Sequence, residues 1–336
     1  MNNISKRLVT GVAAVAMLTA VAFEATAATE LRLATAAPQK TPWGAWMQGI
    51  ADRVEKASGG ELKIKIFFSS QLGNEQVTMR QTVRGRIDIS AQSNTATSLV
   101  VPEFSLLSAP YLWDSPAQAD CAFDNYIGKV YAPMMKENGL IILTWVEVGQ
   151  EIIFSRKAVK SPADMAKMKI RVAPTKPAVG YFEAVGANPV PLGTTDSIPS
   201  LKTGTVNAAV WPTVYGIAIG THKLAPNVIV TNHGHQIGTL VMSKKVWDKL
   251  SAQEQSWLQK SSDEAGALRK GVRGAEKALL AKIEKAGVPV YRPTPAEMEQ
   301  WRAAAKPARE KLVRDTGGKA EAIWSKIIKA RDACRS

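Results

Sequence analysis

Short apolar segments of strand character alternate with segments of helical spacing along the first ninety residues of the chain. Strands are expected at residues 31–35, 62–68 and 87–90. Helices are expected between them: one at 43–57, preceded by Thr41-Pro42, and one that starts at Asn74 and stops at Gly85. Strands and helices that alternate at this spacing predict an α/β fold.

The later part of the chain continues with the same kinds of element. A continuous apolar run at 141–148 is the best candidate for a strand that crosses the middle of the molecule. The remaining expected strands begin at 152 or lie at 167–172, 206–210 and 239–242, and the expected helices lie at 162–168, 175–185, 195–201, 251–286 and 297–331.

The first 27 residues have the features of a secretory signal peptide. Lys6 and Arg7 precede an apolar run at 8–23, and Ala25-Thr26-Ala27 offers a small-residue cleavage site. The run is too short and too weakly apolar for a spanning helix. A lipid anchor is not expected, because the cleavage site has no cysteine. We therefore expect an exported protein, and the 309 residues left of 336 fit two domains.

The chain carries a large positive net charge, which by itself does not identify a binding partner. Lys and Arg number 43 and Asp and Glu 29, which gives a formal net charge of +14. The basic residues are scattered, with no basic-aromatic strip or recognition motif, so a nucleic-acid partner is not expected. A basic surface can help to gather anionic solutes by electrostatic steering.

Cys121 and Cys334 are the only cysteines. An oxidising compartment permits a disulfide between them, but the sequence does not fix their separation in space, so two unpaired thiols remain the alternative. The chain has no Cys-x-x-Cys, and a zinc or redox site is not expected.

Arg171 is the strongest candidate for a functional side chain. It lies in an alternating run that ends before Pro174 and Pro177, and strand ends of open α/β sheets present ligand-binding groups. A guanidinium in that place can hold a carboxylate through two parallel hydrogen bonds.

The chain resembles the DctP-type solute receptors of tripartite ATP-independent periplasmic (TRAP) transporters. The resemblance rests on short segments that occur in order over nearly the whole chain. They are QLGNE at 71–75, GRID at 85–88, APYLW at 109–113, SPADM at 161–165, KIRV at 169–172, VGANPVP at 185–191, LKTG at 201–204 and VNAAVWP at 206–212.

The resemblance implies a fold, a function and partners. It implies a two-lobed periplasmic binding protein with a ligand cleft between the lobes and a long helix across both. Transferred to this chain, lobe one is 29–148 plus 237–276 and lobe two is 149–236 plus 277–336. Separate small and large integral membrane subunits would receive the solute, and the receptor itself is expected to be a monomer without cofactor.

The resemblance also assigns candidate ligand contacts, with Arg171 holding the ligand's carboxylate. Trp211 stands where sialic-acid receptors of the family carry an asparagine, so an indole would pack an apolar or planar solute, unless it is a core residue. Val210 replaces a family glutamate, which removes support for metal-assisted binding, and no metal is expected. Thr194 replaces an aromatic pocket residue and leaves room on that side.

Further contacts are implied near the start of the chain and near its histidines. Glu75 and His233 match ligand contacts of the sialic-acid receptors, although Glu75 also suits a helix N-terminus. Ser93 stands where those receptors carry a glutamate, and its neighbour Asn94 is the expected substitute contact.

The central strand contributes the last candidates. Gln150 and Glu151 stand where several family members carry a second arginine, which favours one ligand carboxylate over two. Trp145 and Glu147 precede them, and either this pair or the valines that alternate with it face the cleft.

These features favour a receptor over an enzyme. The chain lacks Gly-x-Ser-x-Gly, Ser-x-x-Lys and His-Glu-x-x-His, the common hydrolase signatures. The expected ligand is a monocarboxylate with an apolar, aromatic, 2-oxo or 2-hydroxy portion, delivered in the periplasm to a TRAP transporter. A C4-dicarboxylate receptor and a receptor that serves a sensor kinase are the alternatives.

Overall fold

The computed structural model of the protein describes residues 28–335. The expected signal peptide lies outside the described residues. The strands are β1 (Thr29–Thr35), β2 (Leu62–Phe67), β3 (Ile89–Ser93), β4 (Leu140–Ser155), β5 (Lys169–Val172), β6 (Asn188–Pro191), β7 (Ala208–Pro212), β8 (Asn227–Ser243) and β9 (Val290–Tyr291).

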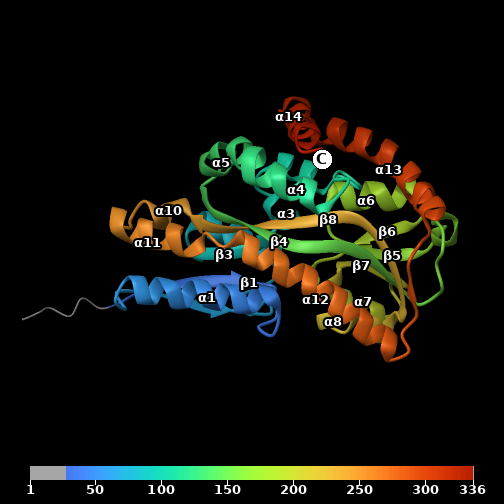
Figure 1. Ribbon diagram of the computed structural model, residues 1–336, viewed down its shortest axis with the longest axis horizontal. Helices are drawn as coiled ribbons and strands as arrows, with labels where there is room; N and C mark the ends of the chain where they lie inside the picture. The colour runs from blue at the N-terminus through green and yellow to red at the C-terminus, as the bar shows by residue number, and fades with distance from the viewer. Residues whose placement is uncertain (1–27, 336) are drawn as a thin grey trace, which may run out of the picture.

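Helices cover both faces of the sheet (Figure 1). The α-helices are α1 (Pro42–Ala57), α2 (Glu75–Arg84), α3 (Asn94–Thr97), α4 (Pro116–Ala122), α5 (Gly128–Glu137), α6 (Lys176–Ala184), α7 (Thr194–Thr203), α8 (Thr213–Ala218), α9 (Thr221–Leu224), α10 (Lys244–Trp247), α11 (Ala252–Ser262), α12 (Ala265–Lys285), α13 (Pro295–Thr316) and α14 (Ala320–Ala333). Short 3₁₀ segments are η1 (Pro102–Ser108) and η3 (Pro162–Met165), and η2 (Phe123–Ile127) is a π-helical turn.

Two long antiparallel strands, β4 and β8, form the backbone of a single mixed sheet. The strand order is β2-β1-β3-β8-β4-β7-β5-β6, with β9 on β8. β3 pairs with the C-terminal part of β8, whereas β7 pairs with the C-terminal part of β4. The two shorter groups of strands therefore flank opposite ends of the β4–β8 pair, which runs through both halves of the molecule.

The buried side chains form clusters on both faces of each half. Trp43, Met47 and Leu62 belong to one cluster in the β1–β3 half, and Ile170, Phe182 and Val210 to one in the β5–β7 half. Two helices pack against both halves. Helix α12 buries Leu268 and Val272 near its start in the first half and Ile283 near its end in the second half. On the other face, α13 buries Trp301 in the second half and Leu312 in the first half.

The C-terminal helix α14 is fixed to the first half of the molecule. Its buried Ile323, Ile327 and Ala330 join the cluster that contains residues of η1, α4 and α5. A disulfide links Cys121 on α4 to Cys334 just after α14. This resolves the open alternative in favour of the bond.

Several expected element boundaries are wrong. The runs expected at 141–148 and from 152 form one strand, β4, because bulges near Gly149 and Glu151 preserve the pairing with β8. β8 begins twelve residues before the expected Thr239, at Asn227. The stretch 251–286 is two helices, and its break falls at Asp263 and Glu264 rather than at a glycine.

Two more helices differ from expectation. The helix expected at 297–331 divides at Gly317 and Gly318, both of which have positive φ, into α13 and α14. The helix expected at 162–168 is the single 3₁₀ turn η3, after which Lys167 takes a positive φ. Within residues 28–335, no helix is both long and apolar enough to cross a membrane.

Candidate functional site

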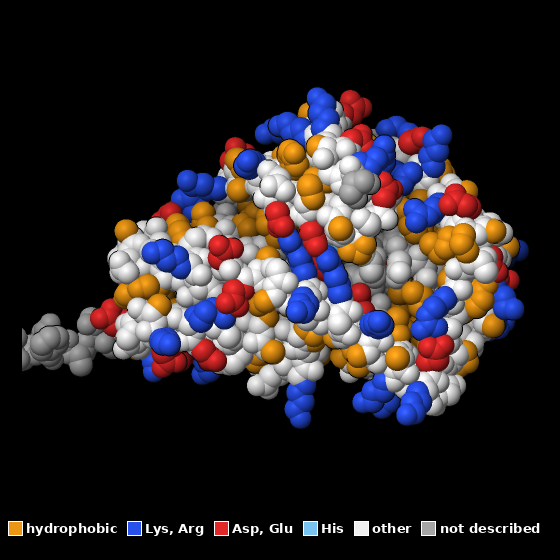
Figure 2. All heavy atoms as spheres, in the orientation of Figure 1, with side chains coloured by type: hydrophobic (Ala, Val, Ile, Leu, Met, Phe, Trp, Pro, Cys, Tyr) orange, Lys and Arg blue, Asp and Glu red, His pale blue; other side chains and the backbone are white. Residues whose placement is uncertain are grey.

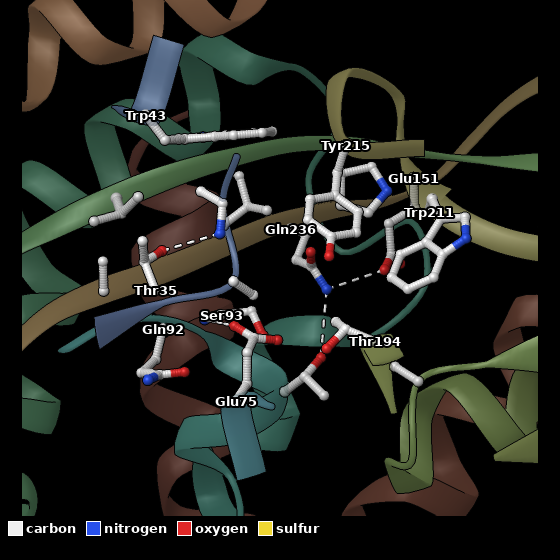
Figure 3. Close-up of a pocket in the computed structure, with 18 of the residues that line it drawn as sticks. Thr35, Trp43, Glu75, Gln92, Ser93, Glu151, Thr194, Trp211, Tyr215 and Gln236 are labelled. Atoms are coloured by element: carbon white, nitrogen blue, oxygen red, sulfur yellow. Dashed lines mark hydrogen bonds between the residues drawn. The ribbon is translucent and has the colours of Figure 1, made fainter. Parts of the chain in front are cut away.

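A cavity opens where the two halves of the molecule meet beside β4. Its wall is built from β1, β3, α1 and α2 of the first half, from β5, β7, α7 and α8 of the second, and from β4 and β8. Figure 3 shows its polar side chains converging from these elements. The space between the lining atoms is about 780 Å³, open solvent at the mouth included.

Arg171 supplies the positive charge of this cavity. It lies on β5, only 3% exposed, and its Nε and Nη2 donate to the carbonyl oxygen of Leu192 at 3.0 and 2.9 Å. Nη1 donates to the carbonyl oxygen of Val210 at 2.9 Å. A guanidinium has five N–H groups, so one remains on each terminal nitrogen, the pair that binds a carboxylate end-on.

The indole of Trp211 supports this guanidinium. The Cζ of Arg171 lies 3.5 Å from the centre of the Trp211 ring, which is a cation–π contact within a buried site. Burial lowers the pKa of Arg171 to about 9, and the charges of Tyr215, Glu151 and Glu75 oppose that shift. The guanidinium therefore stays charged at neutral pH.

Two carboxyl groups share the cavity with Arg171. Glu75, the first residue of α2, accepts hydrogen bonds from the backbone N–H of Ser93 at 2.8 Å and from its hydroxyl at 2.9 Å. Burial raises the pKa of Glu75, and the bonds from Ser93 and the charge of Arg171 reduce the shift.

Glu151 lies on β4 and has fewer donors. Its Oε1 accepts one hydrogen bond, from Nε2 of Gln236 at 3.2 Å, and the same amide donates to Oγ1 of Thr95 at 3.3 Å. Burial raises the pKa of Glu151 to about 7 against the opposing charge of Arg171.

Several hydrogen-bond acceptors lie on the wall of the cavity away from Arg171. Gln92 on β3 is only 2% exposed, and its Nε2 donates to Oγ1 of Thr78 at 2.8 Å. The Oε1 of Gln92 has no hydrogen-bond partner within residues 28–335. We call Glu75, Gln92, Glu151 and Gln236 the acceptor wall. It suits a ligand that carries hydrogen-bond donors away from its carboxylate.

An apolar surface completes the cavity. Trp43, Trp46 and Met47 of α1 line it together with Val146 and Val148 of β4. Nε1 of Trp43 donates to the carbonyl oxygen of Glu147 at 2.7 Å, which fixes the indole against β4. Such a surface packs against the carbon skeleton of a small solute.

Comparison with known proteins identifies the family. The model of the DctP family, "Bacterial extracellular solute-binding protein, family 7", matches residues 33–315. The chain belongs to the DctP family. The coarse prediction of a TRAP-type solute receptor is thereby confirmed.

Individual DctP relatives support the same conclusion. The 2,3-diketo-L-gulonate-binding periplasmic protein YiaO of Escherichia coli is 29% identical over 241 residues, which are 71% of this chain and 74% of YiaO. The sugar acid binding protein DctPAm of Advenella mimigardefordensis, solved with galactonate, is 25% identical with a TM-score of 0.85. The alignment covers 90% of this chain and 99% of DctPAm.

A third DctP relative confirms the fold at higher identity. A TRAP periplasmic solute binding protein of Bradyrhizobium sp. BTAi1, solved with α/β-D-galacturonate, is 29% identical with a TM-score of 0.84. The alignment covers 90% of this chain and all of that one. The expected two-lobed α/β fold, with a long helix across both lobes, is confirmed.

Five of the side chains predicted as DctP ligand contacts line the cavity: Glu75, Ser93, Arg171, Thr194 and Trp211. Of these, Ser93 holds Glu75 in place and Trp211 supports Arg171. Thr194, the first residue of α7, has a hydroxyl without a partner within residues 28–335. Their roles as ligand contacts stay predictions.

His233 lies one layer behind the cavity. It lines a smaller chamber with Tyr181 and Phe182, and its Nδ1 is 2.7 Å from Oγ1 of Thr231. Burial lowers the pKa of His233 to about 3, so the ring is neutral and does not meet an anion as a cation.

Besides His233, four further predicted contacts do not line the cavity. Asn94 is fully buried and donates to Ser108 at 2.6 Å. Nε2 of Gln150 lies 3.1 Å from Nδ1 of His235, on the side of β4 away from the cavity. Gln150 is placed differently from expectation because neighbouring residues on a strand point to opposite faces, whereas Asn94 begins α3 and its side chain is buried there.

The structure shows which of the alternating residues on β4 face the cavity. Val146 and Val148 face the cavity, so Trp145 and Glu147 face the opposite side of the sheet. Trp145 packs between Phe104 and Phe123. Glu147 accepts hydrogen bonds from Arg273 of α12 at 2.8 and 2.9 Å.

The sequence reasoning missed Gln236, Tyr215 and Trp43 as cavity residues and treated Glu151 only as a missing arginine. Gln236 was missed because β8 was expected to begin after it. The position of Trp43 could have been predicted, because it begins the helix that follows the first strand. Residues at such helix starts face the same edge of the sheet as a strand-end residue such as Arg171.

Proposed function

We propose that this protein is the periplasmic solute receptor of a TRAP transporter for a hydroxylated monocarboxylic acid. The observation that carries the proposal is the pair of free N–H groups that buried Arg171 presents to a cavity between the two halves. The carboxylate binds there, and the halves close around the solute as in other periplasmic receptors.

The charges of the cavity favour one carboxylate over two. Among the described residues that border it, Arg171 is the one cation, and the other ionisable groups are Glu75, Glu151 and Tyr215. A second ligand carboxylate would meet the acceptor wall, which repels it. The C4-dicarboxylate alternative therefore has less support than a monocarboxylate.

The acceptor wall and the apolar surface favour a hydroxylated skeleton. Hydroxyl groups of the acid would donate to Glu75, Gln92 and Gln236, while Trp43 and Val148 pack on its carbon atoms. Galactonate and galacturonate, the solutes bound to two relatives, combine these features. Among the expected ligands, this favours 2-hydroxy acids over purely apolar or aromatic ones.

The family supports the cellular role. Relatives are named as periplasmic binding proteins, and an export signal at 1–27 would bring this chain to the same compartment. The receptor would bind its acid without bond chemistry and hand it to separate membrane subunits.

A thermal-shift screen tests this proposal. The protein is first unfolded and refolded to remove carried solute, then melted with D-galactonate, D-galacturonate, 2-oxo acids, C4-dicarboxylates, neutral sugars and amino acids. A bound ligand raises the melting temperature by mass action, and hydroxylated monocarboxylates are expected to raise it most. No shift with any carboxylate, or turnover of a bound acid, would overturn the proposal.

A further inference from the structure

The cavity holds more negative than positive charge once its ligand is bound. Arg171 provides one positive charge, Glu75 and Glu151 provide two negative charges when ionised, and the acid brings a third. The acid also occupies the two remaining N–H groups of Arg171, so they are no longer available to the carboxyl groups of Glu75 and Glu151. This step rests on the proposed function.

Burying such an excess of negative charge is unfavourable. We expect a group that lines the cavity to neutralise it. A carboxyl group out of water relieves the cost by taking up a proton. The two candidates differ in their donors. Both oxygens of Glu75 accept hydrogen bonds from Ser93, which favours its ionised form, whereas Glu151 accepts only the bond from Gln236 at 3.2 Å.

Within residues 28–335, Arg171 and Glu75 are the charged groups that share the cavity with Glu151. On β8, Nε2 of His233 lies 4.0 Å from Oε2 of Glu151, and that ring is neutral because burial lowers its pKa to about 3. On α8, burial raises the pKa of Tyr215, which is neutral as well. The remaining charged groups are Arg171 on β5 and Glu75 on α2.

We propose that this receptor takes up a proton together with its acid and that the side chain of Glu151 holds the proton. The protonated carboxyl donates to the bound acid or to a hydroxyl of it, so the proton is a second ligand of the site. Glu151 remains 17% exposed, which leaves it a path to solvent.

The expected pH dependence has a definite sign. Burial raises the pKa of ligand-free Glu151 to about 7. Below that pH the proton is already present, and above it the proton must be taken from solvent against a falling concentration. Affinity for the acid should therefore be nearly constant below pH 7 and about ten-fold weaker at pH 8 than at pH 6.

Calorimetric titration with D-galactonate and D-galacturonate tests this at pH 6 and pH 8. At pH 8 the binding enthalpy, compared between phosphate and Tris buffers, should report close to one proton taken up per acid bound. Glu151→Gln cannot take up the proton, so its affinity for the acid should be the same at pH 6 and pH 8 and its binding enthalpy should not depend on the buffer.

Glu276→Gln is the matched control. Glu276 is another buried carboxyl, whose pKa burial raises to about 7, but it lies on α12 outside the cavity and accepts a bond from the backbone N–H of Gln150 at 2.7 Å. This variant should keep the pH dependence of the wild type.

The outcomes separate the two proposals. Failure of both acids and of every other carboxylate in the thermal-shift screen to bind would overturn the proposed function. Acid binding that is independent of pH and buffer would overturn proton uptake alone. So would a dependence that survives in Glu151→Gln.

Discussion

The side chain of Glu151 lies directly against Gly234 of β8. A Cβ placed on Gly234 of β8 would lie 2.2 Å from Oε2 of Glu151 and 3.0 Å from its Cδ. Gly234→Ala is therefore expected to displace Glu151 from Gln236 and to destabilise the fold by about 1–3 kcal/mol. Urea unfolding measures the stability, and calorimetric titration with D-galactonate should show weaker binding.

Gly180→Ala is the control for this variant. Gly180 lies within α6, and a Cβ there meets nothing within 4 Å. The substitution should raise the free energy of unfolding by about 0.5–1 kcal/mol and leave binding unchanged. Wild-type affinity in Gly234→Ala would mean that the position of Glu151 does not matter for the solute.

Trp211 is a positioning residue for Arg171. Its ring lies beneath the guanidinium at 3.5 Å and also joins the buried cluster with Ile152 and Leu201. Trp211→Ala should weaken acid binding by about 2 kcal/mol because Arg171 loses a desolvated cation–π partner. Titration of the variant with the same acid checks this, and lower stability with unchanged affinity would reduce Trp211 to a core residue.

At the scale of elements, an ion-pair network ties α12 to β4 and α4. Arg273 donates to both oxygens of Glu147 and, at 2.7 and 2.8 Å, to both oxygens of Asp120. Burial alone would raise the pKa of Glu147, but hydrogen bonds from His235 and Arg273 outweigh it and lower the pKa. The network therefore stabilises the fold above pH 4.5, and the stability is lost as pH falls through the lower folded pKa.

Arg273→Ala should lower the free energy of unfolding at pH 7 by about 1–3 kcal/mol, because it leaves Glu147 buried with one donor fewer. The loss should shrink at pH 4 and below, where Glu147 becomes protonated in the unfolded chain. Arg292→Ala, which breaks an exposed pair with Glu284, is the control and should cost much less, because solvent screens that pair. Equal losses in the two variants would contradict the role of the network.

The disulfide fastens the end of the chain to the first half. Cys121 and Cys334 are 213 residues apart in sequence, so the bond restricts the unfolded chain strongly. Replacing both with serine should lower the free energy of unfolding by about 2–5 kcal/mol. Urea unfolding with and without reductant checks this: reductant should lower the stability of the wild type to that of the variant, and no effect of reductant on the wild type would show that the bond contributes nothing.

The packing of α14 bears on the division into lobes. We propose that the division holds as expected from the resemblance, 29–148 plus 237–276 and 149–236 plus 277–336, with one amendment. Since Ile323 and Ile327 of α14 are buried with η1 and α4, the segment after Gly317 and Gly318 is better assigned to lobe one.

At the scale of the whole molecule, the two halves meet over the cavity. A Cβ on Gly193, just before α7, would lie 3.3 Å from Nδ2 of Asn74, just before α2. The surface carries intermingled basic and acidic side chains on the face shown in Figure 2 rather than one basic patch. On this face the charge is thus spread, which suits general attraction of anions better than docking on a polyanion.

The α/β class, the first strands and helices, and the position of Arg171 at a strand end could be predicted from local sequence patterns. The length of β4 and β8 could not, because Gly149 and the polar residues near it interrupt the apolar pattern while bulges keep the strands paired. The acceptor wall was partly hidden for a related reason. Gln236 and Gln92 meet only through the pairing of distant strands, and sequence spacing does not contain that pairing.

The most direct test of the account is calorimetric titration of wild type, Arg171→Lys and Lys169→Ala with the acid that the screen identifies. Lys169 is an exposed cation on the same strand and should not matter for binding. Lysine keeps the charge of Arg171 but cannot present two parallel N–H groups, so Arg171→Lys should bind at least about 50-fold more weakly. Binding by Arg171→Lys within about three-fold of the wild type would contradict the central claim that the free N–H pair of Arg171 holds the carboxylate.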